Sequence, residues 1–340
     1  MRWTAAGALA LALVAGCGGA SDAGSAGPGN TEVATGGRLF STADEATARL
    51  GADVGPGVFP RTITHARGTT RLERKPERVV VLDTGELDAV LALGTVPAGM
   101  ATPNGTVPVG IATPNETIPS YLQEQVAGAT NIGSLDGLRL EAIAALQPDL
   151  ILGSQLRVDQ LYDQLSQIAP TVLSIRPGFP WKENLLLAGA ALGEETKAIE
   201  LLNDYQRRAD AVRAALPSPP TVSLLRFMPD RIRLYANLSF IGVILRDIGL
   251  PRPPNQDVQE LAAEISQERI ADADADWIFY SSYGPPDRTA EQAVVGGELW
   301  NRLGAVQRGT ARPVDDEVWF LGLGPTGAFR ALEDLQEFLR

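Results

Sequence analysis

The chain has 340 residues, of which 44% are hydrophobic, a formal net charge of −12, one histidine and one cysteine. This apolar share is ample for a buried core, whereas the acidic balance argues against a nucleic-acid partner, because phosphate binding needs a basic surface. An anionic small ligand stays open, since a local arginine cluster can lie inside an acidic protein.

The start of the chain is typical of an exported lipoprotein. A positive charge and an apolar stretch too short to span a bilayer precede Val14-Ala15-Gly16-Cys17, which resembles the lipobox that signal peptidase cuts before a lipid-modified cysteine. We therefore expect a signal peptide over 1–16, a lipid on Cys17 and a disordered tether over 17–57, because large apolar side chains are nearly absent from 18–36. A plain secretory signal with a chance cysteine is the alternative.

From about residue 60, short β-branched runs alternate with helical stretches, which predicts an α/β fold built on mostly parallel sheets. These elements form a predicted N-terminal lobe over 58–180. In chain order, the pattern predicts a strand at 79–82, a helix capped by Thr84 and ending at Gly94, a strand at 97–100, a helix at 140–146, a strand at 150–152, a helix at 160–168 and a strand at 171–175.

Residues 181–216 contain no strand-like run, and neither Gly nor Pro occurs between Glu194 and Leu216. Apolar side chains recur there at helical spacing, which predicts a helix of about 23 residues, or about 35 Å, long enough to cross between two lobes. A C-terminal lobe over 217–340 follows. Its predicted elements are strands at 222–227, 232–235, 277–280 and 318–321 and an amphipathic helix through 329–339.

A weak internal repeat links the two lobes. Glu141 and, eight residues later, Asp149 return as Glu268 and Asp276, with isoleucine and alanine at matched positions. The repeat places a glutamate at a helix start and an aspartate at the opening of a strand, once in each lobe.

Three runs carry a resemblance to a known family: KPERVVVLD at 75–83, GELDAVLALG at 85–94 and LEAIAALQPDLI at 140–151. They closely resemble the ABC-transporter solute-binding proteins for ferric siderophores, haem and cobalamin, the type III periplasmic binding proteins. The resemblance implies two Rossmann-like lobes joined by a long rigid α-helix, with the ligand in the cleft between them. It also implies an extracytoplasmic, lipid-anchored monomer that delivers its ligand to an ABC permease dimer with its ATPase.

The family docks its permease through one glutamate on each lobe, and the resemblance assigns these roles to Glu141 and Glu268. The internal repeat supports the assignment, because a roughly two-fold permease requires like groups at equivalent places. The alternative is that both are first-turn carboxylates, which the helix dipole favours by about 0.3–1 kcal/mol. The two interpretations are compatible.

The resemblance also points to arginines for the ligand, because ferric siderophores are often net anions. Guanidinium groups hold such oxygens well, since they stay charged and donate in a fixed fork. Arg157 follows the strand at 150–152 at the spacing where some catecholate-siderophore binders place a contacting arginine, although an exposed helix-start arginine would merely be solvated. A predicted hairpin carries Arg226, Arg231, Arg233 and Tyr235, and not every arginine there can face the ligand. We expect Arg226, Arg233 and Tyr235 to contact it.

Two aromatic residues complete the predicted site. Trp181 and Tyr283 follow predicted strands, where loops meet the cleft, and both could stack on a flat ligand. An aromatic residue near a strand end is also a common core residue.

Two other classes of function are disfavoured. An enzyme lacks support because the chain has one histidine, His65, and neither a Gly-x-Ser-x-Gly elbow nor a phosphate loop. A direct metal site would need several His and carboxylate ligands. We therefore expect no catalytic residues, no metal site and no cofactor, with a ferric siderophore as ligand. Haem or cobalamin is the alternative, with Tyr235 or Tyr283 as the candidate haem-iron ligand.

Overall fold

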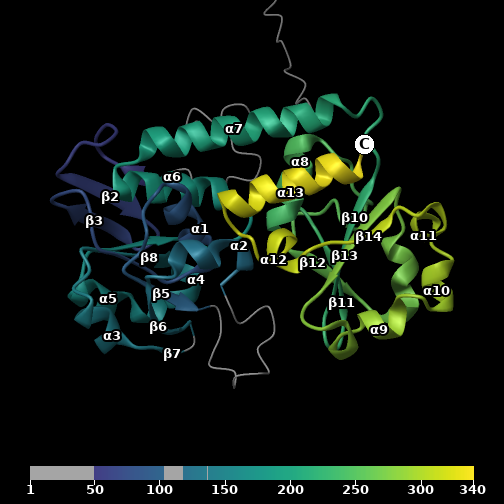
Figure 1. The fold of residues 1–340 in the computed structure, drawn as a ribbon, viewed down its shortest axis with the longest axis horizontal. Helices are drawn as coiled ribbons and strands as arrows, with labels where there is room; N and C mark the ends of the chain where they lie inside the picture. Colours follow the sequence, from purple (N-terminus) through teal and green to yellow (C-terminus); the bar gives the residue numbers. More distant parts are fainter. Residues whose placement is uncertain (1–49, 103–117, 136) are drawn as a thin grey trace, which may run out of the picture.

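The computed structural model describes residues 50–102, 118–135 and 137–340, which form two α/β lobes side by side (Figure 1). A small antiparallel sheet of β1 (Gly51–Ala52), β2 (Arg61–His65) and β3 (Gly68–Leu72) opens the described chain. The tether predicted over 17–57 therefore ends too late, because β1 lies inside this range and pairs with β2. The buried Arg61 of β2 holds this segment in place, because its guanidinium donates to the carbonyl oxygens of Val58 and Ala190.

The N-terminal lobe is built on a six-stranded sheet in the order β7-β6-β5-β4-β8-β9, parallel except for β7. Its central strands are buried, as their continuous apolar runs predict. The strands are β4 (Val79–Val81), β5 (Gly99–Thr102), β6 (Thr130–Ser134), β7 (Gly137–Leu138), β8 (Leu150–Ser154) and β9 (Thr171–Ser174), and the helices are α1 (Thr84–Ala92), α2 (Ser120–Gln123), α3 (Leu140–Ala145), α4 (Gln155–Val158) and α5 (Tyr162–Ile168).

The C-terminal lobe is built on a five-stranded sheet in the order β12-β11-β10-β13-β14, in which β10, β13 and β14 run parallel. The hairpin of β10 and β11 has the predicted bounds. The strands are β10 (Val222–Phe227), β11 (Ile232–Tyr235), β12 (Ala262–Ile265), β13 (Trp277–Ser282) and β14 (Ala311–Pro313), and the helices are α8 (Phe240–Ile248), α9 (Glu291–Val294), α10 (Glu298–Asn301), α11 (Gly304–Arg308), α12 (Asp316–Trp319) and α13 (Pro325–Phe338), with a 3-10 helix at Gln267–Ala273.

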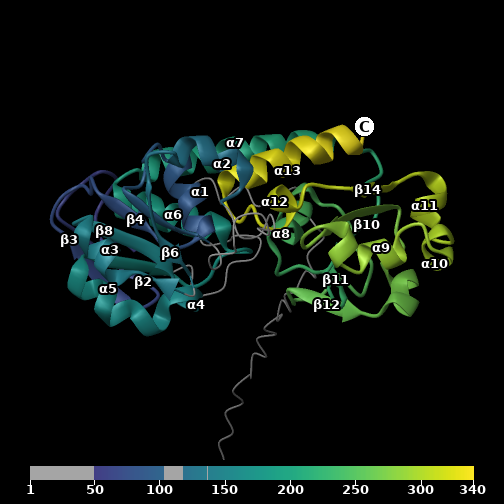
Figure 2. The ribbon, with the colours of Figure 1, turned by 60° about the horizontal axis from the view of Figure 1, so that its bottom comes forward.

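Three helices join the lobes. The segment after β9 forms α6 (Trp181–Leu192) and α7 (Glu195–Ala214), which are separated by Gly193 in a left-handed conformation. The predicted long helix is thus confirmed as α7, which runs along one side of the molecule over both lobes with α13 beside it (Figures 1 and 2).

Two local predictions are wrong. The run at 318–321 lies in the helix α12 and the turn after it, not in a strand; Asp315 caps this helix by accepting from the Glu317 amide at 2.9 Å. Helix α1 is capped by Asp83, whereas Thr84 is already its first helical residue. A short apolar run fits a buried helix and a buried strand equally well, so periodicity could not separate them.

Candidate functional site

A pocket of about 340 Å³ lies between the lobes and is lined by residues of both. On the N-terminal side, its polar residues follow three neighbouring parallel strands: Asp83 after β4, Arg157 after β8 and Arg176 after β9. On the other side, Arg226 lies in β10 and Tyr283 follows β13. Ligands of open α/β sheets bind outside the carboxyl ends of the strands, and this pocket has that position.

Asp83 and Arg157 form a polar pair at the N-terminal wall. The carboxylate of Asp83 is buried and accepts from the Ser154 hydroxyl at 2.7 Å, and the Nε atom of Arg157 lies 3.7 Å from it. Burial raises the pKa of Asp83, while the Arg157 charge opposes the rise. The Arg157 side chain is 45% exposed, so a ligand in the pocket can contact it directly.

A second carboxyl group, Glu86, lies behind this wall. One oxygen accepts from the Ser174 hydroxyl, and the other has no hydrogen-bond partner in the described part of the chain. Burial, together with the charge of Asp83, raises the pKa of Glu86 to about 8. Glu86 is therefore largely protonated at neutral pH and adds little negative charge near the pocket.

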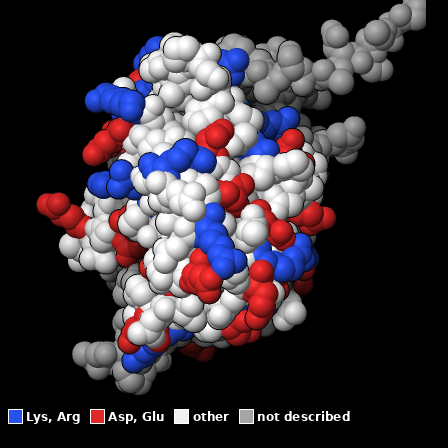
Figure 3. Space-filling view, turned by 90° about the vertical axis from the view of Figure 1, so that its right-hand side faces the viewer, with Lys and Arg blue, Asp and Glu red and all other residues white. Residues whose placement is uncertain are grey.

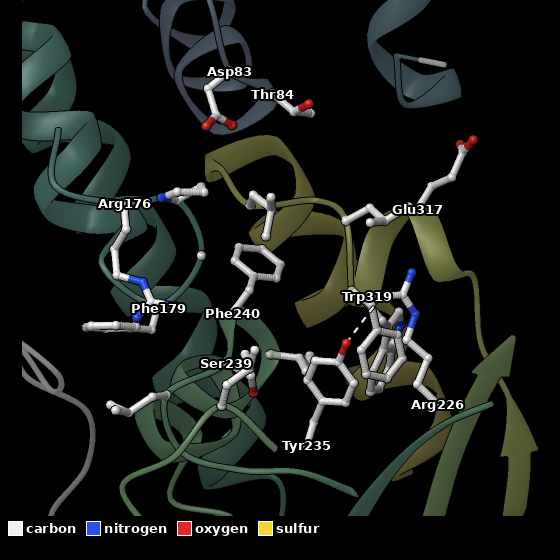
Figure 4. A pocket seen from close by; sticks show the side chains of 18 of the residues that line it. Asp83, Thr84, Arg176, Phe179, Arg226, Tyr235, Ser239, Phe240, Glu317 and Trp319 are labelled. Atoms are coloured by element: carbon white, nitrogen blue, oxygen red, sulfur yellow. Dashed lines mark hydrogen bonds between the residues drawn. The ribbon is translucent and has the colours of Figure 1, made fainter. Parts of the chain in front are cut away.

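Arg176 is the pocket arginine that sequence reasoning missed. Its guanidinium lies 5.0 Å from the centre of the Phe179 ring, and no carboxylate of the described residues pairs with it. Its buried Nε atom also lacks a hydrogen-bond partner among those residues. Both residues belong to the segment after β9, and their side chains lie against each other at one edge of the pocket (Figure 4). The signal that could have found Arg176 is its position directly beyond a parallel strand.

Arg226 lies at the C-terminal wall but is already paired. Its Nε and Nη2 atoms donate to the two carboxylate oxygens of Asp316 at 2.7 and 2.5 Å, and its Nη1 atom donates to the Tyr235 hydroxyl at 3.2 Å (Figure 4). The Tyr283 ring lies 4.6 Å from the guanidinium. Burial lowers the pKa of Arg226, but Asp316 and Tyr235 raise it, and the net shift is upward. The structure thus brings together three predicted residues: Arg226, Tyr235 and Tyr283.

Arg233 does not line the pocket. It lies directly opposite Arg226 on the paired strand, so both project from the same face of the sheet, but its Nε atom donates to Glu264 of β12 at 3.2 Å. The side chain therefore points along the sheet toward its open edge. The prediction that Arg233 contacts the ligand has no support from this geometry.

The prediction that Trp181 stacks on the ligand is wrong. Trp181 is 1% exposed and packs edge-on against Tyr205, with ring centres 4.9 Å apart. It begins α6 and points into the core that joins the lobes, so the core interpretation holds. Beside the predicted Tyr235 and Tyr283, the pocket has an aromatic wall of four residues that the sequence did not single out: Phe179, Phe240, Trp319 and Phe320.

Glu141 and Glu268 occupy equivalent exposed positions, each in the first turn of a helix that leads into a parallel strand. The repeated aspartates, Asp149 and Asp276, also have the same structural role in the two lobes. Asp149 accepts from the amide of Arg78, just before β4, and Asp276 accepts from the amide of Thr221, just before β10, both at 2.8 Å. The repeat thus reflects one structural unit present in both lobes.

Several predictions concern other parts of the molecule. Cys17, the signal peptide and most of the tether lie outside the described residues. None of the helices in the described ranges is long and apolar enough to cross a membrane. His65 is buried in β2, where its Nε2 atom lies 2.9 Å from the Thr70 hydroxyl oxygen; burial lowers its pKa to about 4.

Comparisons with known proteins identify the family. The periplasmic binding protein family model matches residues 79–316. The chain is 33% identical over 292 residues to the probable siderophore-binding lipoprotein YfiY of Bacillus subtilis, covering 82% of this chain and 87% of that protein. It is 30% identical over 270 residues to the achromobactin-binding periplasmic protein of Dickeya dadantii, covering 76% and 85%. The structure of Staphylococcus aureus SirA complexed with staphyloferrin B matches with a TM-score of 0.72 and 30% identity, over 82% of this chain and 98% of that one. The resemblance drawn from the three sequence runs is confirmed, and the chain belongs to the periplasmic binding protein family.

Proposed function

We propose that this protein is the extracytoplasmic solute-binding component of an ABC importer, which captures a ferric siderophore between its lobes and delivers it to the permease. The observation that carries the proposal is Arg176, an arginine that faces the interlobe pocket without a carboxylate partner among the described residues. The relatives named for siderophore binding support the ligand class.

The pocket suits a chelate that combines anionic oxygens with flat rings. Arg176 and Arg157 offer fixed forks of N–H donors to carboxylate, catecholate or hydroxamate oxygens. The ring of Tyr283, which lines the pocket and is partly exposed, offers a face for the apolar parts of the chelate. Binding then requires no covalent chemistry, and we infer that the protein is not an enzyme.

Delivery would use the exposed glutamates and the lipid anchor. Glu141 and Glu268 would meet arginines of the two permease subunits, one from each lobe. The lipid on Cys17 would keep a monomeric binder at high local concentration beside its permease.

Acidic and basic side chains are interspersed on the outer end of the C-terminal lobe, which is consistent with no nucleic-acid partner (Figure 3).

Titration of the signal-free protein with four ligand types tests the ligand class: a ferric catecholate, a ferric hydroxamate, haem and cobalamin. Trp319 lines the pocket, so a bound ferric chelate should quench tryptophan fluorescence. Binding of haem or cobalamin alone would establish the alternative ligand instead. Quenching by no ferric siderophore would reject the proposal.

A pair of arginine variants tests the site. Because Arg176 faces the pocket and Arg233 does not, Arg176→Gln should weaken binding of an anionic ferric chelate by about tenfold or more, whereas Arg233→Gln should leave it within about twofold. Equal losses in both variants would contradict the assignment of Arg176.

A further inference from the structure

The charges around the pocket are unequally balanced between the two lobes. On the C-terminal side, Arg226 is 4% exposed, and its pairing with Asp316 cancels its charge locally. On the N-terminal side, Arg157 is 45% exposed and lies 3.7 Å from Asp83, and Arg176 has no carboxylate partner in the described ranges. The uncompensated positive charge of the pocket therefore lies on the N-terminal lobe.

Asp316 is held in place by hydrogen bonds and pairs closely with Arg226. Its two oxygens accept from two nitrogens of Arg226 in a fork, and its Oδ1 atom also accepts from the Ser281 hydroxyl at 2.6 Å. The Asp316 side chain is only 12% exposed, so water screens the pair weakly. Three of the five N–H donors of Arg226 are used within the protein, which leaves a neutral, rigid wall instead of a free cation.

A second carboxylate strengthens the asymmetry. Glu317, the neighbour of Asp316 on α12, lines the pocket and accepts from the amide of Ser120 at 2.8 Å across the cleft. A highly charged anion would therefore meet Arg157 and Arg176 on one side and a neutral to acidic wall on the other.

We propose that Asp316 is a specificity-determining residue. It is a built-in counter-charge that limits the negative charge of the ligand the pocket accepts and orients the anionic end of the ligand toward Arg157 and Arg176. The less charged part of the chelate then contacts Tyr235, Tyr283 and the aromatic wall. This inference rests on the proposed function, because it concerns the ligand of that same pocket.

The test compares ferric chelates of different charge. A neutral ferric tris-hydroxamate and a trianionic ferric tris-catecholate are titrated into the wild type and into Asp316→Asn, which keeps the shape of the side chain but exposes the Arg226 charge to the ligand. We expect the ratio of the two affinities to shift toward the trianion by about tenfold or more. Glu264→Gln is the matched control, because it removes the same charge from the edge of the same sheet, outside the pocket, and should leave the ratio unchanged.

A second pair of variants guards against a loss of folding caused by an unpaired buried arginine. The double variant Arg226→Gln with Asp316→Asn removes both charges and should keep the wild-type affinity ratio within about threefold. The single variant Arg226→Gln leaves Asp316 unpaired and should reduce the affinity for the trianion relative to the neutral chelate by about tenfold. If the wild type binds a chelate but the affinity ratio is unchanged in both Asp316→Asn and Arg226→Gln, the inference about Asp316 is overturned and the proposed function stands. A wild type that binds neither chelate rejects the proposed function together with it.

Discussion

Two carboxyl groups, Asp83 and Glu86, lie within one turn of each other at the start of α1, and both are buried. They differ in their partners. Asp83 has the Arg157 charge and the Ser154 hydroxyl nearby, whereas one oxygen of Glu86 finds no partner among the described residues. Burial raises the pKa of both carboxyl groups, and the charge of Asp83 adds to the rise for Glu86, whose pKa reaches about 8.

The raised pKa of Glu86 predicts a pH-dependent stability. A carboxyl group whose pKa is higher in the folded protein than in the unfolded chain favours folding when protonated, and it loses this contribution as the pH rises from about 4.5 to about 8. Glu86→Gln mimics the protonated form. It should therefore stabilise the protein at pH 8, by on the order of 2–5 kcal/mol, and have little effect at pH 5.

Urea unfolding of both proteins at pH 5 and pH 8 measures this difference. Glu73→Gln, which changes an exposed glutamate, provides the control and should have no comparable pH-dependent effect. A loss of stability in Glu86→Gln that is equal at both pH values would contradict the protonated state of Glu86.

At the scale of elements, α13 depends on another helix for its N-terminal cap. Its own N-cap residue, Gly324, has no side chain to offer, and the Asp88 carboxylate of α1 accepts instead from the amides of Thr326 and Gly327 at 2.9 and 3.1 Å. A Cβ atom at Gly324 would lie 2.5 Å from the Cβ atom of Asp88, so the glycine permits this contact. The last helix of the chain is thereby fixed to the first helix of the N-terminal lobe.

Removing this cap should destabilise the protein. Asp88→Ala leaves the buried amide of Gly327 and the part-buried amide of Thr326 without their acceptor, and we expect a loss of about 1–3 kcal/mol. Asp88→Asn keeps one acceptor oxygen and should lose less. Thermal unfolding of the two variants against the wild type measures the difference, and a stability of Asp88→Ala equal to that of the wild type would show that the amides find another partner.

At the scale of the whole molecule, one hydrophobic cluster spans both lobes, while a second lies within the C-terminal lobe and a third within the N-terminal lobe. A single cluster of buried side chains includes Leu152 of the N-terminal sheet, Leu202 of α7 and Leu224 of the C-terminal sheet. We therefore expect one cooperative thermal transition for the described lobes, with equal calorimetric and van't Hoff enthalpies. Two separate calorimetric transitions would show that the lobes unfold independently.

A buried polar cluster ties three helices together at this junction. The Lys182 ammonium of α6 lies 2.5 Å from the Asp247 carboxylate of α8, which also accepts from the Tyr205 hydroxyl of α7 at 2.7 Å. Lys182→Met should leave a buried carboxylate without its cation and reduce the free energy of unfolding by about 3–5 kcal/mol.

Because the cluster lies between the lobes, Lys182→Met should shift the whole transition to lower temperature. Combining it with Asp247→Leu should recover part of the loss, because no unpaired charge then remains. Scanning calorimetry of both variants tests this, and a destabilisation confined to one lobe would contradict the role of the cluster as an interlobe connection.

The sequence by itself determined the local elements. Strands β10 and β11 have their predicted bounds and α7 lies within the predicted 194–216, because period and breakers are local properties of the chain. The three family-like runs also fixed the family, and they cover the first turns of α1 and α3. Of the site, Arg157, Arg226, Tyr235 and Tyr283 were identified because they lie on or directly after strands.

Only the tertiary structure decided how these residues are used. Arg226 and Arg233 are equivalent by alternation, yet one lines the pocket and is neutralised by Asp316, 90 positions away, while the other pairs with Glu264. Trp181 is drawn into the core by Tyr205 and Phe240, and Arg176 becomes the receptive arginine because no carboxylate of the described chain reaches it. Charge pairing and burial depend on which distant segments meet, and spacing along the chain does not encode that.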